Sequence, residues 1–172
     1  PVRTWGMQID GRSLWWSVHG RNKRSMTINM RHPEARDLVL ALAAKVDVVV
    51  ENYRPGQIEK WGLTPAAFEA VKPGLVLVRI SGYGQTGPEA PRSGFGVIGE
   101  AKGGLRHLSG YPADVTDLPP VRPGIAIGDS ISGFYGALGA LAAVIGQRAS
   151  GEKALKVVDV ALGESVMSLL EG

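Results

Sequence analysis

Residues 124–145 read GIAIGDSISGFYGALGALAAVI, and they carry the clearest structural pattern in the sequence. A short apolar run, Ile125–Ile127, predicts a strand that leads into Gly128 and Asp129, and a helix rich in Gly and Ala is expected after it. An Asp at such a junction is typical of an N-cap, whose carboxylate accepts backbone N–H bonds and interacts favourably with the helix dipole. The stretch therefore predicts a strand-to-helix transition.

Three glycines, Gly133, Gly136 and Gly139, remove bulk from the expected helix. Each costs about 1 kcal/mol of helix propensity relative to alanine, so a packing or binding reason for them is expected. A helix with so little side chain lets a neighbouring chain segment or a large ligand approach its backbone closely.

Short apolar runs alternate with helical segments on both sides of this stretch. Strands are expected at 26–29, 47–51, 75–81 and 155–160. Residues 1–12 are expected to be irregular. Helices are expected at 13–19, 33–45 (with Leu38, Leu40, Leu42 and the neighbouring alanines buried), 57–61, 64–71, 92–104 and 161–171. The alternation predicts an α/β fold, a Rossmann-like open and mainly parallel sheet with flanking helices.

Composition excludes several classes of protein. The 172 residues suit one domain, and 44% hydrophobic with 20% charged residues excludes a wholly disordered chain. Zero cysteines exclude disulfides, thiolate metal sites and cysteine nucleophiles, and they fit the cytoplasm, where we expect the protein. No uninterrupted apolar run reaches the roughly 18 residues of a membrane span, and no hydrophobic leader opens the sequence, so no membrane partner is expected.

The glycine-rich segment Gly82–Gly87 follows an expected strand, where open α/β sheets bind ligands. Pro88 comes directly after it and cannot continue the helix that a dinucleotide fingerprint requires, so NAD binding is not expected. The histidines, His19, His32 and His107, are expected to be structural or surface residues, and no metal site is predicted.

Four motifs resemble those of the class III CoA-transferases, the CaiB/BaiF family that includes formyl-CoA transferase. They are NKRS at 22–25, VENYRPG at 50–56, SGYGQTGP at 81–88 and GDSISG at 128–133. Each motif alone is weak, but all four occur in the family's order, and the resemblance runs over nearly all of the chain.

The resemblance implies that Asp129 is a catalytic nucleophile that forms a mixed anhydride and then an aspartyl-CoA thioester, which is covalent catalysis. Backbone N–H groups of Ser130 and the nearby glycines are candidate donors to the oxyanions. The implied substrates are an acyl-CoA and a small carboxylic acid, with no tightly bound cofactor. The residues that the resemblance assigns to coenzyme A are Ile28, Arg31, Asn52, Tyr53, Arg54 and Lys60, with Arg31 and Lys60 on its phosphates and Tyr53 or Trp61 on its adenine.

The sequence departs from some relatives, which carry Gly-His-Asp or Gly-Phe-Asp where this chain has Gly94-Phe95-Gly96. α-Methylacyl-CoA racemases of the same family use that His as an acid–base group, which Phe95 cannot replace. A racemase-like enzyme is therefore the less favoured alternative, and the role of position 96 is left open.

The resemblance also implies that residues 1–172 are part of a large CoA-binding and catalytic domain. Its first strand and helix would precede Pro1, a small domain would follow Gly172, and the full-length protein would be an interlocked homodimer. A different alternative is a non-catalytic nucleotide-binding module, in which the basic residues between 21 and 36 hold phosphates and Asp129 only caps a helix. Nucleic acid is not expected as a partner, because no nucleic-acid-binding signature accompanies these residues.

Overall fold

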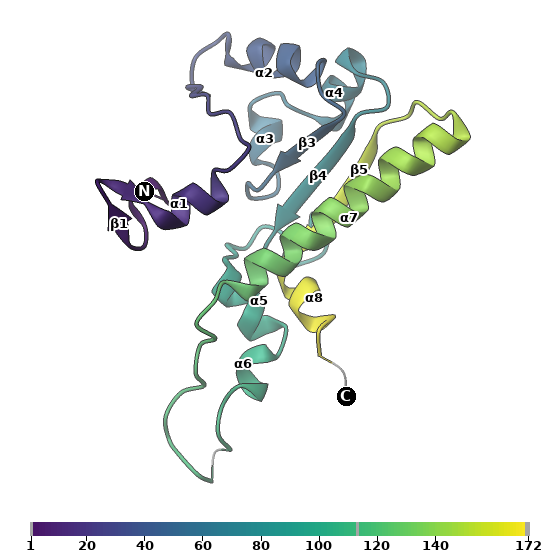
Figure 1. The fold of residues 1–172 in the computed structure, drawn as a ribbon. Helices are drawn as coiled ribbons and strands as arrows, with labels where there is room; N and C mark the ends of the chain where they lie inside the picture. Colours follow the sequence, from purple (N-terminus) through teal and green to yellow (C-terminus); the bar gives the residue numbers. More distant parts are fainter. Residues whose placement is uncertain (1, 113, 171–172) are drawn as a thin grey trace. The chain divides into compact units, whose positions relative to one another are not determined.

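The computed structural model describes residues 2–112 and 114–170. It divides into two units, Pro1–Arg31 and His32–Gly172 (Figure 1). The first unit holds a 3₁₀ helix, η1 (Val2–Thr4), a hairpin of β1 (Gln8–Ile9) and β2 (Arg12–Ser13), and α1 (Leu14–His19).

The hairpin corrects the expectation that residues 1–12 are irregular. Asp10 and Gly11, the two residues between its strands, have positive φ angles of 48° and 72°, as a type I′ turn requires. Ser13 then begins α1, because its hydroxyl oxygen accepts a hydrogen bond from the Trp16 N–H at 2.9 Å. The helix expected at 13–19 is thus confirmed.

The second unit is an α/β fold built on a three-stranded parallel sheet in the order β3-β4-β5. Its strands are β3 (Val48–Glu51), β4 (Val76–Ser81) and β5 (Lys156–Ala161). Its helices are α2 (Ala35–Ala43), α3 (Gln57–Lys60), α4 (Pro65–Val71), α5 (Gly96–Lys102), α6 (Leu105–Leu108), α7 (Ile127–Ser150) and α8 (Leu162–Met167). The parallel register pairs Glu51 with Arg79 and Arg79 with Asp159, so charged residues of all three strands lie side by side.

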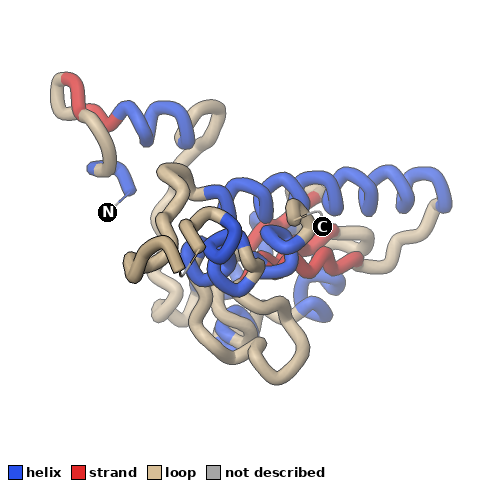
Figure 2. The backbone as a smooth tube through the Cα atoms, turned by 90° about the horizontal axis from the view of Figure 1, so that it is seen from below, coloured by secondary structure: helices blue, strands red, loops and turns tan. Residues whose placement is uncertain are grey.

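The central strand β4 is the core of this unit. Residues 75–78 are at most 2% exposed. Because strand side chains alternate between faces, Val76 and Val78 pack against Ala140 of α7, whereas Arg79 lies on the opposite face with Glu59 of α3. Figure 2 shows α7 running along the sheet.

Close packing on the sheet explains two of the three glycines of α7. A Cβ atom on Gly136 would lie 3.2 Å from Val78, and one on Gly139 would lie 2.5 Å from Val158. The approaching segment is therefore the sheet itself, and larger residues at 136 and 139 would push the helix away from it. Gly133 has open space around it, so packing does not explain that position.

Two expected strands are absent. Residues 26–29 have no strand partner in the described part of the chain, and their period-2 pattern alone does not make a strand without a neighbouring one. Ile125–Ile127 is also wrong, because α7 already begins at Ile127 and Ile125 is 65% exposed. The parallel arrangement of the strands near 48–51 and 76–81 is confirmed.

Helix α2 buries fewer residues than its sequence predicts. Leu40 and Ala43 are buried together with Ala35, but Leu38 and Leu42 are 46% and 42% exposed. Positions 40 and 43 are three apart and share a face, whereas 38 and 42 belong to a different one. This second face is open in the described chain.

The outer side of α7 carries an apolar stripe. Phe134, Leu138, Leu141 and Ile145 are 59–67% exposed and recur at a spacing of three or four residues. By length and composition alone, α7 is long and apolar enough to cross a membrane. The search for uninterrupted apolar runs did not reveal this, because glycines and polar residues lie between its apolar residues. A core helix passes the same test, and α7 packs on β4 and β5.

Candidate active site

Asp129 lies in the first turn of α7, but it is not the N-cap. The N-cap is Ala126, and Asp129 is the third helical residue, with no side-chain capping bond. The expected N-cap role of Asp129 is therefore wrong, because the helix begins three residues earlier than the sequence pattern indicates. The carboxylate still benefits from the positive end of the helix dipole.

The backbone donors near Asp129 differ from the expected set. The Ser130 N–H donates to the Ala126 carbonyl at 3.0 Å and is occupied within the helix. Helix geometry leaves the N–H groups of Ile127, Gly128 and Asp129 without an acceptor inside the helix. These three groups, and not that of Ser130, are the donors that α7 itself offers to a developing oxyanion.

The Asp129 carboxylate lies against the start of α5. A Cβ atom on Gly96 would be 2.6 Å from Asp129 Oδ2, and one on Gly128 would be 2.7 Å from the Gly96 carbonyl oxygen. The two helix starts therefore approach this closely only because both positions are glycine. The missing side chain at position 96, whose role the sequence leaves open, makes room for the Asp129 carboxylate.

A second carboxylate, Glu100, lies one turn along α5 on the same face as Gly96. Glu100 is fully buried, and its Oε2 accepts a hydrogen bond from Arg106 Nε at 3.3 Å. Arg122 Nε lies 3.9 Å from the same oxygen. The sequence gives no sign that Glu100 is special, because a Glu inside a short helix is most often solvated, and only packing reveals its burial.

These surroundings raise the pKa of Asp129 above that of an ordinary aspartate. Desolvation by the packed segments is the main cause, the negative charge of Glu100 adds to it, and the positive charge of Arg122 opposes it. Asp129 nevertheless remains exposed to solvent. The site thus combines an accessible carboxylate with an environment that disfavours its charge, which is typical of a functional acid.

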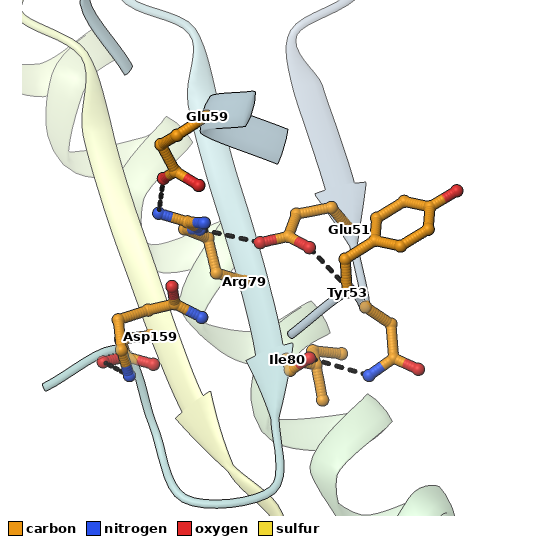
Figure 3. Close-up of polar contacts among 8 residues, drawn as sticks. Glu51, Tyr53, Glu59, Arg79, Ile80 and Asp159 are labelled. Carbon is orange, nitrogen blue, oxygen red and sulfur yellow. Dashed lines mark hydrogen bonds and ion pairs between the residues drawn. The ribbon is translucent and has the colours of Figure 1, made fainter. Parts of the chain in front are cut away.

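Four of the six residues assigned to coenzyme A gather after β3. The Asn52 amide donates to the Ile80 carbonyl at 2.7 Å, tying this segment to the end of β4 (Figure 3). Tyr53 is 49% exposed and meets Trp61 edge to face at 5.0 Å between ring centroids. Arg54 and Lys60 are exposed. An exposed Tyr53 packed on a half-buried Trp61, close in sequence to two exposed cations, suits an adenine and phosphates.

The other two residues, Ile28 and Arg31, belong to the first unit. Ile28 is half-buried and Arg31 is exposed, with its backbone N–H donating to Asn29 Oδ1 at 3.1 Å. Both lie outside regular secondary structure. Their assignment to coenzyme A stays a prediction.

A buried ion-pair cluster holds the ends of the strands in place beneath this surface (Figure 3). Arg79 contacts Glu51 and Glu59 at 2.7 Å each, and the Tyr53 N–H donates to Glu51 at 2.7 Å. Burial works against the charge of Arg79, but its hydrogen bonds to Glu59 and Glu51 outweigh it and the pKa of Arg79 is raised. The cluster fixes the backbone from which Asn52 and Tyr53 project.

The glycine-rich segment after β4 borders a cavity of about 310 Å³. Tyr83, Lys102 and Glu164 line it, and Lys102 pairs with Glu89 at 2.7 Å. Gly82 and Gly94 are in mutual backbone contact beside it, which brings the loop before α5 to the end of β4. The sheet end, Asp129 and the residues after β3 therefore share one edge of the sheet, where open α/β folds bind ligands.

Within residues 2–112 and 114–170, no group of three or more His, Asp or Glu side chains is arranged to hold a metal. His19 stacks on Trp15 with ring centroids 4.1 Å apart, and His32 Nδ1 accepts a hydrogen bond from the Glu34 N–H at 3.4 Å. His107 is exposed on α6. The three histidines have the structural and surface positions expected of them.

The parallel sheet, with a carboxylate at a helix start beside the carboxyl end of its central strand, defines an open α/β enzyme-like fold. The family model described as CoA-transferase family III matches residues 1–172. A crystal structure of a CaiB/BaiF family protein from Brucella suis superposes with a TM-score of 0.86 at 33% sequence identity, over 98% of this chain and 44% of that one. The chain belongs to CoA-transferase family III, as its motifs predict.

Two relatives with named activities are also similar to the chain. The succinyl-CoA–D-citramalate CoA-transferase of Chloroflexus aurantiacus is 48% identical over 172 residues, 99% of this chain and 41% of that protein. The succinyl-CoA:glutarate CoA-transferase of Homo sapiens is 37% identical over 148 residues, 86% of this chain and 33% of that protein. The chain thus spans less than half the length of these relatives.

Proposed function

We propose that this chain belongs to an enzyme that transfers CoA from an acyl-CoA to a carboxylic acid, with Asp129 as the covalent nucleophile. The observation that carries the proposal is the position of the Asp129 carboxylate. It lies at the start of α7 against Gly96 of α5, and its desolvation there raises the pKa of Asp129. Family membership and the activities named for two relatives support the reaction type.

In the first half of the reaction, an Asp129 carboxylate oxygen attacks the thioester carbonyl carbon. The C–S bond breaks, CoA leaves as a thiolate and a mixed anhydride remains. The thiolate then attacks the Asp129 carbonyl carbon, the acyl group leaves as a free carboxylate, and Asp129 holds CoA as a thioester. Splitting the exchange in this way replaces one difficult displacement with easier steps.

In the second half, the acceptor carboxylate attacks the aspartyl thioester and again releases the CoA thiolate. The thiolate attacks the acceptor's carbonyl carbon in the new anhydride, which forms the product acyl-CoA and frees the Asp129 carboxylate. Each step passes through an oxyanion, for which the free N–H groups of Ile127, Gly128 and Asp129 are candidate donors.

The residues after β3 are proposed to hold CoA. Lys60 and Arg54 would pair with its phosphates, Tyr53 would stack on its adenine, and Asn52 would keep this segment next to β4. Ile28 and Arg31 complete the proposed set. CoA acts here as a substrate that enters and leaves, so no resident cofactor is proposed.

A dicarboxylic acyl group is the proposed cargo. Both relatives are named for succinyl-CoA, and their acceptors, D-citramalate and glutarate, are also dicarboxylic acids. We extend the proposal to a homodimer in the full-length protein, and sedimentation of that protein would test the oligomeric state. We also propose that the protein is cytoplasmic.

Trapping the intermediate tests the proposed function. Full-length protein is incubated with succinyl-CoA, treated with hydroxylamine and digested, and the peptide that contains Asp129 is analysed by mass spectrometry. A hydroxamate at Asp129 is the expected product. An unmodified Asp129 during measurable CoA transfer would eliminate the nucleophilic role. Unmodified Asp129 with α-hydrogen exchange and no transfer would favour the racemase-like alternative.

A further inference from the structure

The loop that leads into α7 places a cation, Arg122, near the candidate active site. The proposed reaction steps give this residue no role. Arg122 lies seven residues before Asp129, between Val121 and Pro123. Its loop turns back on itself, because a Cβ atom on Gly110 would lie 3.4 Å from Pro120. The side chain of Arg122 is 56% exposed, and within residues 2–112 and 114–170 its one ion pair is the 3.9 Å approach to Glu100.

Arg106 is the main ionic partner of Glu100. Arg106 makes the closer contact, 3.3 Å to the same oxygen of Glu100, and only 19% of its side chain is exposed. The 3.9 Å approach of Arg122 is longer than a hydrogen bond, so it constrains the Arg122 side chain only weakly. Arg122 therefore lies near Glu100 with more than half of its side chain exposed to solvent.

Arg122 is also close to the nucleophile. Gly96 touches the Asp129 carboxylate, Glu100 lies on the same face of α5 one turn later, and Arg122 approaches Glu100 from the loop. The positive charge of Arg122 lowers the pKa of Asp129 against the other influences, as a cation at this position must.

The charges of this group change during the proposed reaction. Before acylation, Arg106 and Arg122 are balanced by Glu100 and Asp129. When Asp129 becomes part of the mixed anhydride, its negative charge passes to the departing CoA thiolate, and the four groups carry one uncompensated positive charge. A carboxylate on the acyl group would restore the balance, and a guanidinium binds a carboxylate with two parallel hydrogen bonds.

We propose that Arg122 is a specificity-determining residue, which binds the distal carboxylate of a dicarboxylic acyl group attached to CoA. The inference rests on the proposed CoA-transferase function and adds the group that would distinguish a dicarboxylic from a monocarboxylic substrate. Arg106 cannot take this role without leaving buried Glu100 unpaired, which is costly.

The test compares two donors in the full-length enzyme. Succinyl-CoA and butyryl-CoA have the same chain length and differ in a carboxylate or a methyl group at the distal end. In Arg122→Gln we expect kcat/KM for succinyl-CoA to fall about 10- to 100-fold, the usual effect of losing a charge-assisted hydrogen bond. We expect the value for butyryl-CoA to change less than about threefold. Arg122→Lys should retain part of the preference, because it keeps the charge but not the fork.

Arg148→Gln is the matched control, since Arg148 is an exposed arginine in the last turn of α7. It should leave both donors unaffected. An equal loss for both donors in Arg122→Gln, or no loss for either, would overturn the inference. Should that variant not fold, a wild-type enzyme that does not prefer succinyl-CoA to butyryl-CoA would overturn it as well. Absence of CoA transfer from every donor in the wild type would instead count against the proposed function.

Discussion

Gly96 and Asp129, 33 positions apart in the sequence, touch so closely that no other residue fits at position 96 with the carboxylate in place. The contact joins the start of α5 to the start of α7, with 2.6 Å between the position of a Cβ on Gly96 and Asp129 Oδ2. The obstructing atom is at the end of a side chain, so the chain would relieve the overlap by turning Asp129 and not by unfolding.

Gly96→Ala should therefore fold normally and transfer CoA slowly. A displacement of about 1 Å in a reacting group costs about 100-fold in rate, and we expect a loss of that order in kcat. Steady-state CoA transfer and a thermal melt of the full-length variant measure the two properties. Gly146→Ala, at an open position on α7, is the control and should stay fully active. A fully active Gly96→Ala would show that the contact does not position Asp129.

Asp129→Asn should abolish transfer and slightly stabilise the protein at neutral pH. The folded pKa of Asp129 is raised, so its contribution to stability is fully present below the unfolded pKa and is lost as pH rises through the folded pKa. Removing the charge relieves this cost at pH 7, and the side chain's exposure keeps the gain small, about 1–3 °C in melting temperature.

The stability gain of Asp129→Asn should disappear in strongly acidic buffer, where wild-type Asp129 is protonated in both states. Melting curves at pH 7 and below about pH 3 make the comparison. A variant that is less stable than the wild type at pH 7 would contradict the raised pKa. Near-normal transfer, with deamidation excluded by mass spectrometry, would contradict the nucleophilic role.

The pH dependence of kcat/KM should show an acidic limb set by Asp129. A nucleophilic carboxylate must be ionised, so activity should fall as pH decreases through its raised pKa, which lies above the ordinary value of about 3.9. Arg122→Gln removes a positive charge that lowers this pKa and should move the limb to higher pH. The butyryl-CoA reaction is the suitable readout, because the limb then reports Asp129 without the distal carboxylate. A limb that stays in place in Arg122→Gln would exclude their electrostatic coupling.

Arg79→Met should destabilise the protein by about 3–5 kcal/mol, since it leaves Glu51 buried without its ionic partner. Urea denaturation of the full-length protein measures the loss. Glu59→Gln is the comparison and should cost less, because the Glu59 side chain is 32% exposed and water can replace part of what it loses. Equal stability of Arg79→Met and wild type would mean that the cluster does not hold the strand ends.

Lys60→Ala should raise the KM for acyl-CoA several-fold with little change in kcat, and should flatten the salt dependence of KM. An exposed cation paired with a phosphate is screened by salt, so its removal also removes that part of the salt effect. Arg31→Ala is predicted to behave in the same way. Lys45→Ala, an exposed lysine just beyond α2, is the control. Unchanged KM in both test variants across ionic strength would remove Lys60 and Arg31 from the proposed CoA site.

The alternation of strands and helices in the second unit follows from local sequence patterns. Val48–Glu51 and Val76–Ser81 are short apolar runs, which favour buried parallel strands, and Thr64-Pro65 begins α4 with a cap and an N1 proline as expected. The four motifs also sufficed to identify the family. These features are local, because strand and helix propensities, helix caps and sequence motifs depend on consecutive residues.

Only the tertiary structure decided which residues meet. Met26–Asn29 alternates like a strand but has no partner strand in the described chain, and α7 begins before the residue that resembled its cap. The burial of Glu100, its two arginines and the contact of Gly96 with Asp129 join segments that are distant in sequence. Hydrogen-bond partners, desolvation and the space for a Cβ depend on packing, which no pattern of neighbouring residues contains.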